Sequence, residues 1–228
     1  MRHQKFWARG VALAILAATL IVGTAVAGAI TKKTIHVFSG GADGSGPTAL
    51  ISDAAGNLYG TTKDGGAAGR GTVFKLAHNA DGTWTHTVLF SFSGVDGENP
   101  LAGLVWDGAG DLYGTTESGG DLGYGVVFEL MPGTGGSWSE QVLHSFNPTG
   151  ANDGAHPYDG LIFDGAGNLY GTTFFGGLHS SGTVFELSPT LSGWQETQLY
   201  SFVGQMDGSN PTAGVVFDGA GNLYGTTS

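Results

Sequence analysis

The heptapeptide Gly56-Asn57-Leu58-Tyr59-Gly60-Thr61-Thr62 decides the fold, because the chain repeats it three more times with little change. The four copies occupy residues 56–62, 110–116, 167–173 and 221–227, and successive copies begin 54 or 57 residues apart. A fixed period of this size indicates an array of small units that each pack against their neighbours.

Each unit contains four short apolar segments in the same order, and we predict that each is a β-strand. The first ends at an aspartate, the second is the Leu-Tyr-Gly-Thr-Thr of the heptapeptide, the third carries Val-Phe-(Lys/Glu)-Leu, and the fourth follows a tryptophan. In the third strand Phe and Leu share one face, and Val and the charged residue share the other. The glycine in the second strand (Gly60, Gly114, Gly171 and Gly225) predicts a close neighbour, since glycine otherwise weakens a strand.

Four strands in about 50 residues are typical of a β-propeller blade. We therefore predict an all-β, propeller-like array with three full units and partial units at both ends, incomplete or open as a ring. Residues 34–38 are predicted to be a lone fourth strand, whereas the last unit stops at Ser228 after its second strand. That second strand would keep an unpaired edge, which proteins normally avoid. We expect either that the repeats continue beyond Ser228 or that the final unit is irregular.

Composition narrows the class of protein. The chain has 228 residues, 43 of them glycine, with no cysteine and a net charge of −11. Abundant glycine without a Gly-X-Y period fits many tight turns and excludes collagen. The lack of cysteine excludes disulfides, thiolate nucleophiles and cysteine-ligated zinc. No Lys or Arg follows Lys75, so two thirds of the chain lack the basic footprint that nucleic acid or anionic lipid would need.

Residues 1–27 are predicted to be a secretory signal peptide. Basic residues lie before residue 10, an apolar run follows at 11–22, and Ala25-Val26-Ala27 matches the small-residue cleavage pattern. The alternative is a retained membrane anchor, because residues 10–30 carry no charge and about 20 apolar residues can span a bilayer. In both cases we expect residues 28–33 to be a short linker, and residues 34–228 to be an exported domain that is secreted, periplasmic or on the cell surface.

The run Gly-Asn-Leu-Tyr-Gly-Thr-Thr, then Gly-Gly, then Gly-Thr-Val-Phe-(Lys/Glu)-Leu resembles the bacterial GloVer repeat family, named after Gloeobacter and Verrucomicrobia. The resemblance extends from about residue 35 to the end. It implies an exported protein built of propeller-like units, often attached to the cell surface by a C-terminal sorting signal. It implies no catalytic residues, since none are established for the family. This chain differs in its few repeats and in having no sorting tail, which favours the expectation that the repeats continue.

Two series of aspartates recur at fixed places in the units. Asp53, Asp107, Asp164 and Asp218 end the first strand, and Asp43, Asp96, Asp153 and Asp207 lie in the loop after the fourth. The first series could bind calcium, because hard cations prefer carboxylate oxygens as ligands. However, the segment lacks the alternating carboxylates and distal glutamate of a calcium loop. We favour a turn-forming role for both series and predict no cofactor.

The histidines do not form a recognisable site. His36 and His144 occupy the repeat position of Phe90 and Tyr200, which predicts packed, half-buried rings. Four other histidines do not recur at equivalent positions of the units, namely His78, His86, His156 and His179. After the N-terminal segment Arg70 is the only arginine, which excludes a sialidase-like site with several arginines. The Gly-rich residues 65–72 lack the Gly-Lys-Ser/Thr of a phosphate loop. We nominate no catalytic, cofactor-binding or metal residue.

The sequence favours a non-enzymatic binding or scaffold module that contacts glycan or a cell-surface protein through its loops or its Tyr and Trp positions. The alternative is a secreted carbohydrate-active hydrolase or lyase with a site in a central channel or on the loops. A scaffold should keep its units equivalent, whereas an enzyme should break their symmetry. The clear asymmetry is the longer loop from Asn147 to His156, so a catalytic site would be expected there.

Overall fold

The computed structural model describes residues 32–149 and 153–228, and residues 34–228 form one compact unit. The predicted signal peptide and most of the predicted linker lie outside the described residues. No helix in the described ranges is long and apolar enough to span a membrane.

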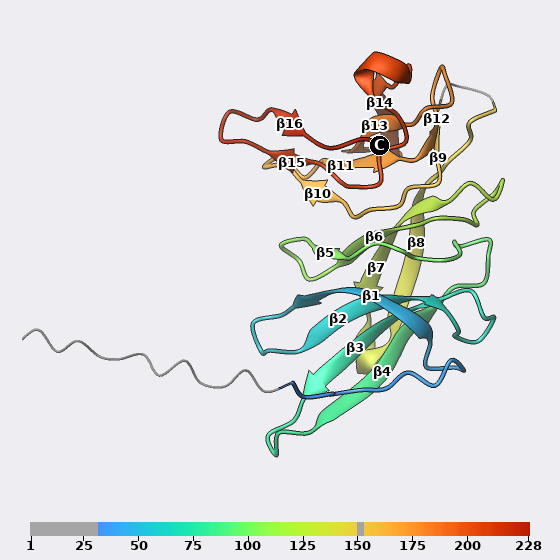
Figure 1. Cartoon of the computed structure of the whole chain (residues 1–228). Helices are drawn as coiled ribbons and strands as arrows, with labels where there is room; N and C mark the ends of the chain where they lie inside the picture. The colour runs from blue at the N-terminus through green and yellow to red at the C-terminus, as the bar shows by residue number, and fades with distance from the viewer. Residues whose placement is uncertain (1–31, 150–152) are drawn as a thin grey trace, which may run out of the picture. The chain divides into compact units, whose positions relative to one another are not determined.

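The three complete repeats are three antiparallel four-stranded sheets, each with its strands in sequence order (Figure 1). Unit 1 contains β1 (Ser45–Ser52), β2 (Leu58–Asp64), β3 (Thr72–His78) and β4 (Trp84–Ser91). Unit 2 contains β5 (Val105–Trp106), β6 (Leu112–Thr116), β7 (Val126–Pro132) and β8 (Trp138–Ser145). Unit 3 contains β10 (Ile162–Phe163), β11 (Leu169–Thr173), β13 (Thr183–Thr190) and β14 (Gly193–Ser201).

The fourth unit is only a hairpin, formed by β15 (Val216–Phe217) and β16 (Leu223–Tyr224). A further two-stranded pair joins β9 (Gly154–Ala155) to β12 (Phe175–Gly176). Two short 3-10 helices, η1 (Thr134–Gly136) and η2 (Gln205–Asp207), lie in connections. The all-β class and the four-stranded units are confirmed, whereas a closed ring of sheets is not found among the described residues.

The heptapeptide runs from the turn into each second strand, and its last three residues each have a structural role. A Cβ added to Gly114 would lie 2.7 Å from Phe128 Cζ, so the predicted close neighbour is the phenylalanine of the third strand. Thr115 Oγ1 donates a hydrogen bond to the carbonyl of Asp159, which leads into the next unit, at 3.0 Å. Thr116 Oγ1 accepts one from Val126 N–H at 3.2 Å, within the sheet. The motif therefore joins strands and units.

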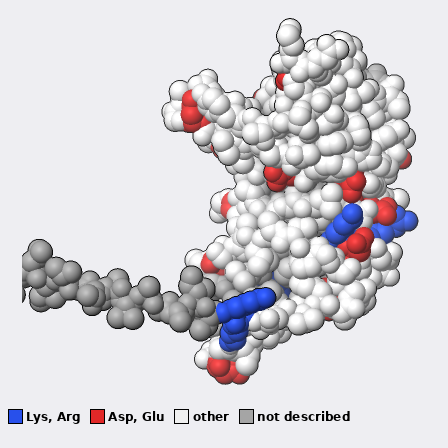
Figure 2. All heavy atoms as spheres, in the orientation of Figure 1, with Lys and Arg blue, Asp and Glu red and all other residues white. Residues whose placement is uncertain are grey.

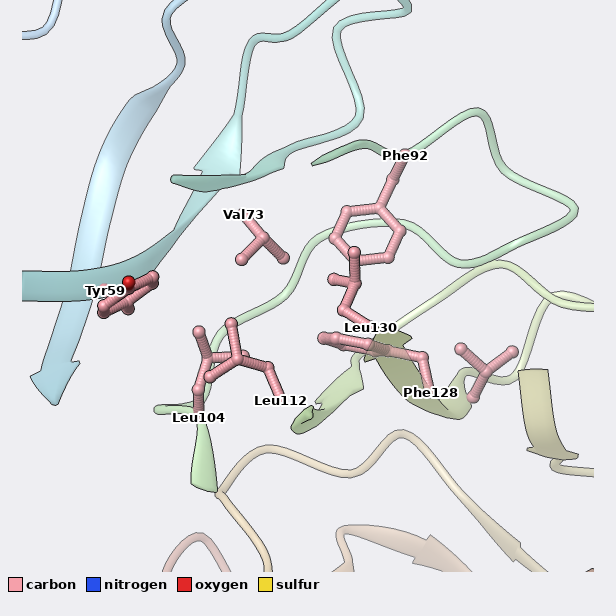
Figure 3. Packing of buried hydrophobic residues seen from close by; sticks show 8 residues of the cluster. Tyr59, Val73, Phe92, Leu104, Leu112, Phe128 and Leu130 are labelled. Carbon is pink, nitrogen blue, oxygen red and sulfur yellow. The ribbon is translucent and has the colours of Figure 1, made fainter. Parts of the chain in front are cut away.

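Hydrophobic side chains of adjacent units form a shared core between their sheets. Between units 1 and 2 the cluster contains Tyr59, Val73 and Phe92 together with Leu104, Leu112, Val126, Phe128 and Leu130 (Figure 3). An equivalent cluster between units 2 and 3 contains Tyr113, Val127, Phe146, Leu161, Leu169, Phe185 and Leu187. Both faces of a third strand are thus buried, because its Val joins one cluster and its Phe and Leu join another.

The predicted strand at residues 34–38 is wrong, since residues 32–39 belong to no strand. A fourth strand pairs with a third strand in every complete unit, and no third strand lies beside residues 34–38 in the described part of the chain. One contact of a fourth strand is nevertheless kept. Phe38 packs edge-on against Phe74 with ring centroids 4.9 Å apart, as Phe92 packs against Phe128 at 5.1 Å.

Candidate functional site

The aspartate that ends each first strand organises the turn to the second strand. Asp53 Oδ1 accepts hydrogen bonds from the N–H groups of Ala55 and Asn57, and its Oδ2 accepts them from Asn57 Nδ2 and Tyr59 Oη. Asp164 and Asp218 make the same four bonds in their own units. Because a carboxylate has about four acceptor positions, these groups are saturated by their own turns. The predicted turn role is confirmed.

These hydrogen bonds also lower the pKa of the turn aspartates. For Asp53 and Asp164 burial acts in the opposite direction, but the donors of the turn outweigh it and the pKa stays below the ordinary value. For the exposed Asp218, the side chain of Asn222 and the backbone N–H groups of Asn222 and Ala220 lower the pKa to about 2. All three side chains are therefore ionised at neutral pH.

Asp107 differs from the other three turn aspartates. Its Oδ1 accepts hydrogen bonds from the N–H groups of Ala109, Gly110 and Asp111, all at 2.8–2.9 Å. Residue 111 is an aspartate where the other units have asparagine, and Tyr113 Oη donates to Glu129 at 2.5 Å instead. Within the described residues Asp107 Oδ2 therefore receives no hydrogen bond. Burial and the charge of Asp107 raise the pKa of Asp111.

Two grooves open beside Asp107, on the side of the sheets where the turns between first and second strands lie (left in Figure 1). Groove A, of about 560 Å³, lies between units 1 and 2 and is lined by Asp53, Tyr59, Trp106, Asp107, Pro132 and Trp138, among others. Groove B, of about 460 Å³, lies between units 2 and 3 and is lined by Trp106, Asp107, Tyr113, Phe163, Asp164, Pro189 and Trp194, among others. Trp106 and Asp107 belong to both grooves.

Aromatic rings form much of each groove and hold one another in place. In groove A the rings of Tyr59 and Trp106 meet edge-on with centroids 4.8 Å apart. In groove B the ring of Tyr113 meets those of Phe163 and Trp194, at 5.1 Å and 6.2 Å. The tyrosines are buried, whereas Trp106, Phe163 and Trp194 keep part of their surface exposed. Each groove thus presents fixed apolar faces beside a carboxylate.

The second aspartate series closes the loop after each fourth strand. Asp96 accepts hydrogen bonds from Ser93, and Asp207 accepts them from Tyr200 Oη and Val203 N–H, both at 2.9 Å. Asp153 accepts one from Asn147 N–H at 2.9 Å, and its Oδ2 lies 2.9 Å from His144 Nε2. The predicted turn role is confirmed here also. His144 and Asp153 make the same kind of contact as Tyr200 and Asp207.

The longer loop from Asn147 to His156 does not gather a new cluster in its described part, which omits residues 150–152. Asp153 is 6% exposed and its carboxylate is occupied by His144 and backbone N–H groups. His156 adopts a positive φ of 55°, and Asn99 and Asn210 at the equivalent position have φ 56° and 50°. His156 Nδ1 lies 2.9 Å from the carbonyl oxygen of Glu117. The loop differs in length, while its ends keep the contacts of the repeat.

The predicted half-burial of His36 and His144 is confirmed, with 22% and 20% of these side chains exposed. His36 stacks on His86 with ring centroids 4.3 Å apart. Within residues 32–149 and 153–228 no three His, Asp or Glu side chains are placed to hold a metal ion. In the view of Figure 2, Lys and Arg form one group at the lower left and another near mid-height at the right edge, and the upper part of the view shows neither.

Glu140 and Glu196 occupy the repeat position of His86, on the fourth strands, and the charge of an acid of the preceding unit acts on each. Burial and then the charge of Asp96 raise the pKa of Glu140 to about 7. Burial and then the charge of Asp153 raise the pKa of Glu196. In both residues Oε1 is buried without a hydrogen-bond partner among the described residues. Such a carboxyl group destabilises the fold when it ionises.

We expect the fold to lose stability as Glu140 ionises. The pKa of Glu140 is raised in the folded state. The stability that the fold has with Glu140 neutral is therefore fully present below pH 4.5 and is lost as the pH rises through about 7. Glu140→Gln should raise the melting temperature at pH 8 by at least about 2 °C and leave it unchanged at pH 5. Calorimetry at both pH values tests this, with the exposed Asp121→Asn as control. An equal gain at both pH values would contradict the assignment.

The comparisons with known proteins agree with the repeat pattern. A search of curated proteins found no match. The family model described as the Gloeobacter/Verrucomicrobia repeat matches residues 21–228, which include all four copies of the heptapeptide. The chain therefore belongs to the Gloeobacter/Verrucomicrobia repeat family.

Proposed function

We propose that this chain is an exported, non-enzymatic binding module that holds neutral glycan chains in grooves A and B. The observation that carries the proposal is the pair Trp106–Asp107, which lines both grooves and combines an apolar face with a free carboxylate oxygen. The export of residues 34–228 rests on the N-terminal sequence, and the arrangement of the units as propeller-like blades rests on their four-stranded sheets.

The chemistry of the grooves favours a ligand with hydroxyl groups and apolar faces. An ionised carboxylate only accepts hydrogen bonds, so the ligand must bring donors to Asp107 Oδ2. Rigid aromatic side chains offer a large contact area at little cost in conformational entropy. A sugar ring meets both demands, because its hydroxyl groups donate and its C–H faces pack against aromatic rings.

The charge of the grooves favours a neutral ligand over a cationic peptide. Asp53 and Asp164 line the grooves, but four donors from their own turns already surround each carboxylate. Of the aspartates that line the grooves, Asp107 has one carboxylate oxygen, Oδ2, that accepts no hydrogen bond from the described residues. One such oxygen can select a hydroxyl group, whereas a cationic partner would depend on the acidic surface as a whole and would weaken with salt.

A glycan array at neutral pH, repeated at low and high salt, tests the proposal. We expect binding to neutral oligosaccharides that does not change with salt. Binding restricted to cationic polymers, or abolished by salt, would contradict it. The bound oligosaccharide should be recovered at its original length after prolonged incubation. A shortened product would replace the binding proposal with the hydrolase or lyase alternative.

A further inference from the structure

The turn of unit 2 keeps the backbone of the other three turns and changes one side chain. Asp107 N–H donates to the carbonyl of Asp111 at 3.1 Å, and Asp111 N–H donates to Asp107 Oδ1 at 2.9 Å. The equivalent two bonds measure 3.0 Å and 2.9 Å in each of the other three units. Asp111 therefore lies beside Asp107 as Asn57 lies beside Asp53.

The asparagine of the other turns has a constant role. Its Nδ2 donates to Oδ2 of the turn aspartate at 2.7 Å in unit 1 and at 2.8 Å in units 3 and 4. An ionised Asp111 has no hydrogen to donate, whereas a protonated Asp111 has one O–H group. The protonation state of Asp111 thus decides whether Asp107 Oδ2 can receive the bond that the other three units make.

Asp111 takes up a proton at a higher pH than Asp53 and Asp164, which line the grooves. Burial and then the charge of Asp107 raise the pKa of Asp111. For Asp53 and Asp164 burial also acts to raise the pKa, but the hydrogen bonds of their own turns outweigh it and the pKa is lowered. As the pH falls, Asp111 is therefore neutralised while Asp53 and Asp164 are still ionised.

The other titratable groups around this turn are engaged elsewhere. Tyr113 Oη donates to Glu129 on β7, and burial and then this hydrogen bond raise the pKa of Tyr113, so the phenol keeps its proton. Lys75 holds the position of Glu129 in unit 1, where its Nζ lies 5.3 Å from the centre of the Tyr59 ring. Among the described residues that line the two grooves none is Lys or Arg, so no basic side chain competes for Asp107 Oδ2.

We propose that the proton of Asp111 opens and closes Asp107 Oδ2, and through it regulates both grooves. As a regulation of glycan binding, this inference rests on the proposed function. Ionised Asp111 leaves Asp107 Oδ2 open to a hydroxyl group of the ligand. Protonated Asp111 donates its O–H to Asp107 Oδ2, which together with the three N–H groups on Oδ1 fills the four acceptor positions of the carboxylate. Because Trp106 and Asp107 line both grooves, the two grooves close together.

Two substitutions of Asp111 fix the two states, and titration calorimetry with the neutral oligosaccharide that binds best on the glycan array compares them. Asp111→Asn supplies a side-chain donor at every pH and should bind at least about tenfold more weakly than the unchanged chain at about pH 7. Asp111→Ala supplies no donor, so it should bind as the unchanged chain does at about pH 7 and keep that affinity at about pH 4.5. The unchanged chain should lose affinity between these two pH values.

Two results would overturn the proposal. One is equal binding by Asp111→Asn and the unchanged chain at neutral pH. The other is a loss of affinity on acidification that is as large in Asp111→Ala as in the unchanged chain, because another group would then be titrating.

A measurement without ligand separates this inference from the proposed function. A crystal structure of the Asp111→Asn chain should place the new amide nitrogen within hydrogen-bond distance of Asp107 Oδ2, as Asn57 Nδ2 lies 2.7 Å from Asp53 Oδ2. An amide turned away from Asp107 would overturn the inference. If the bond forms but the unchanged chain binds no neutral oligosaccharide at neutral pH, control of Asp107 Oδ2 by residue 111 is supported and the proposed function is contradicted.

Discussion

Phe128→Ala is expected to lower the free energy of unfolding by about 3–5 kcal/mol. The ring is fully buried in the cluster between units 1 and 2, packs edge-on against Phe92, and lies against Gly114 (Figure 3). Its loss removes apolar contacts and leaves a cavity bounded by glycine on one side. Because each unit is stabilised mainly by its neighbours, weakening one interface also weakens the units that it joins.

Urea unfolding followed by circular dichroism measures this loss. Leu191→Ala is the control, since Leu191 is fully exposed at the turn between β13 and β14 and should change the free energy by less than about 0.5 kcal/mol. A loss of less than about 1 kcal/mol for Phe128→Ala would show that the stacked units do not depend on this core.

Gly114→Leu is expected to cost about 2–3 kcal/mol, because the new side chain would overlap the ring of Phe128. Gly225→Leu, at the equivalent position of unit 4, should cost less than about 0.5 kcal/mol, since no ring lies there. Neither glycine has a positive φ, so the comparison isolates side-chain packing from backbone strain.

Melting temperatures of the two variants, measured side by side, decide between packing and backbone flexibility as the reason for this glycine. Equal losses in Gly114→Leu and Gly225→Leu would mean that the strand itself requires glycine.

The heptapeptide allowed most of the fold to be predicted. Its period set the units, its glycine indicated a close neighbour, and the aspartate before it indicated a turn; the structure bears out each of these. The N-terminal strand was predicted wrongly because alternation of apolar residues says nothing about a pairing partner. Residues 34–38 keep the aromatic contact of a fourth strand without its hydrogen bonds.

The grooves could not be predicted from one unit, because each is assembled from two. Tyr59 and Trp106 meet only when units 1 and 2 stack, and the offset between sheets is not encoded in the repeat pattern. One signal was visible in the sequence. Asp111 replaces the asparagine found in the other three turns, and this change removes one of the two side-chain donors that the equivalent Oδ2 has in the other units.

The most direct test of the central claim is the number of binding sites for a neutral oligosaccharide, measured by isothermal titration calorimetry. The account predicts two sites in the unchanged chain, one each in Trp138→Ala and Trp194→Ala, and none in Trp106→Ala, because Trp106 lines both grooves. At each groove that loses its tryptophan, the Kd for the oligosaccharide should rise at least about tenfold. Trp84→Ala, which changes the equivalent tryptophan of unit 1 outside both grooves, should keep two sites. A stoichiometry that Trp106→Ala leaves unchanged would contradict the account.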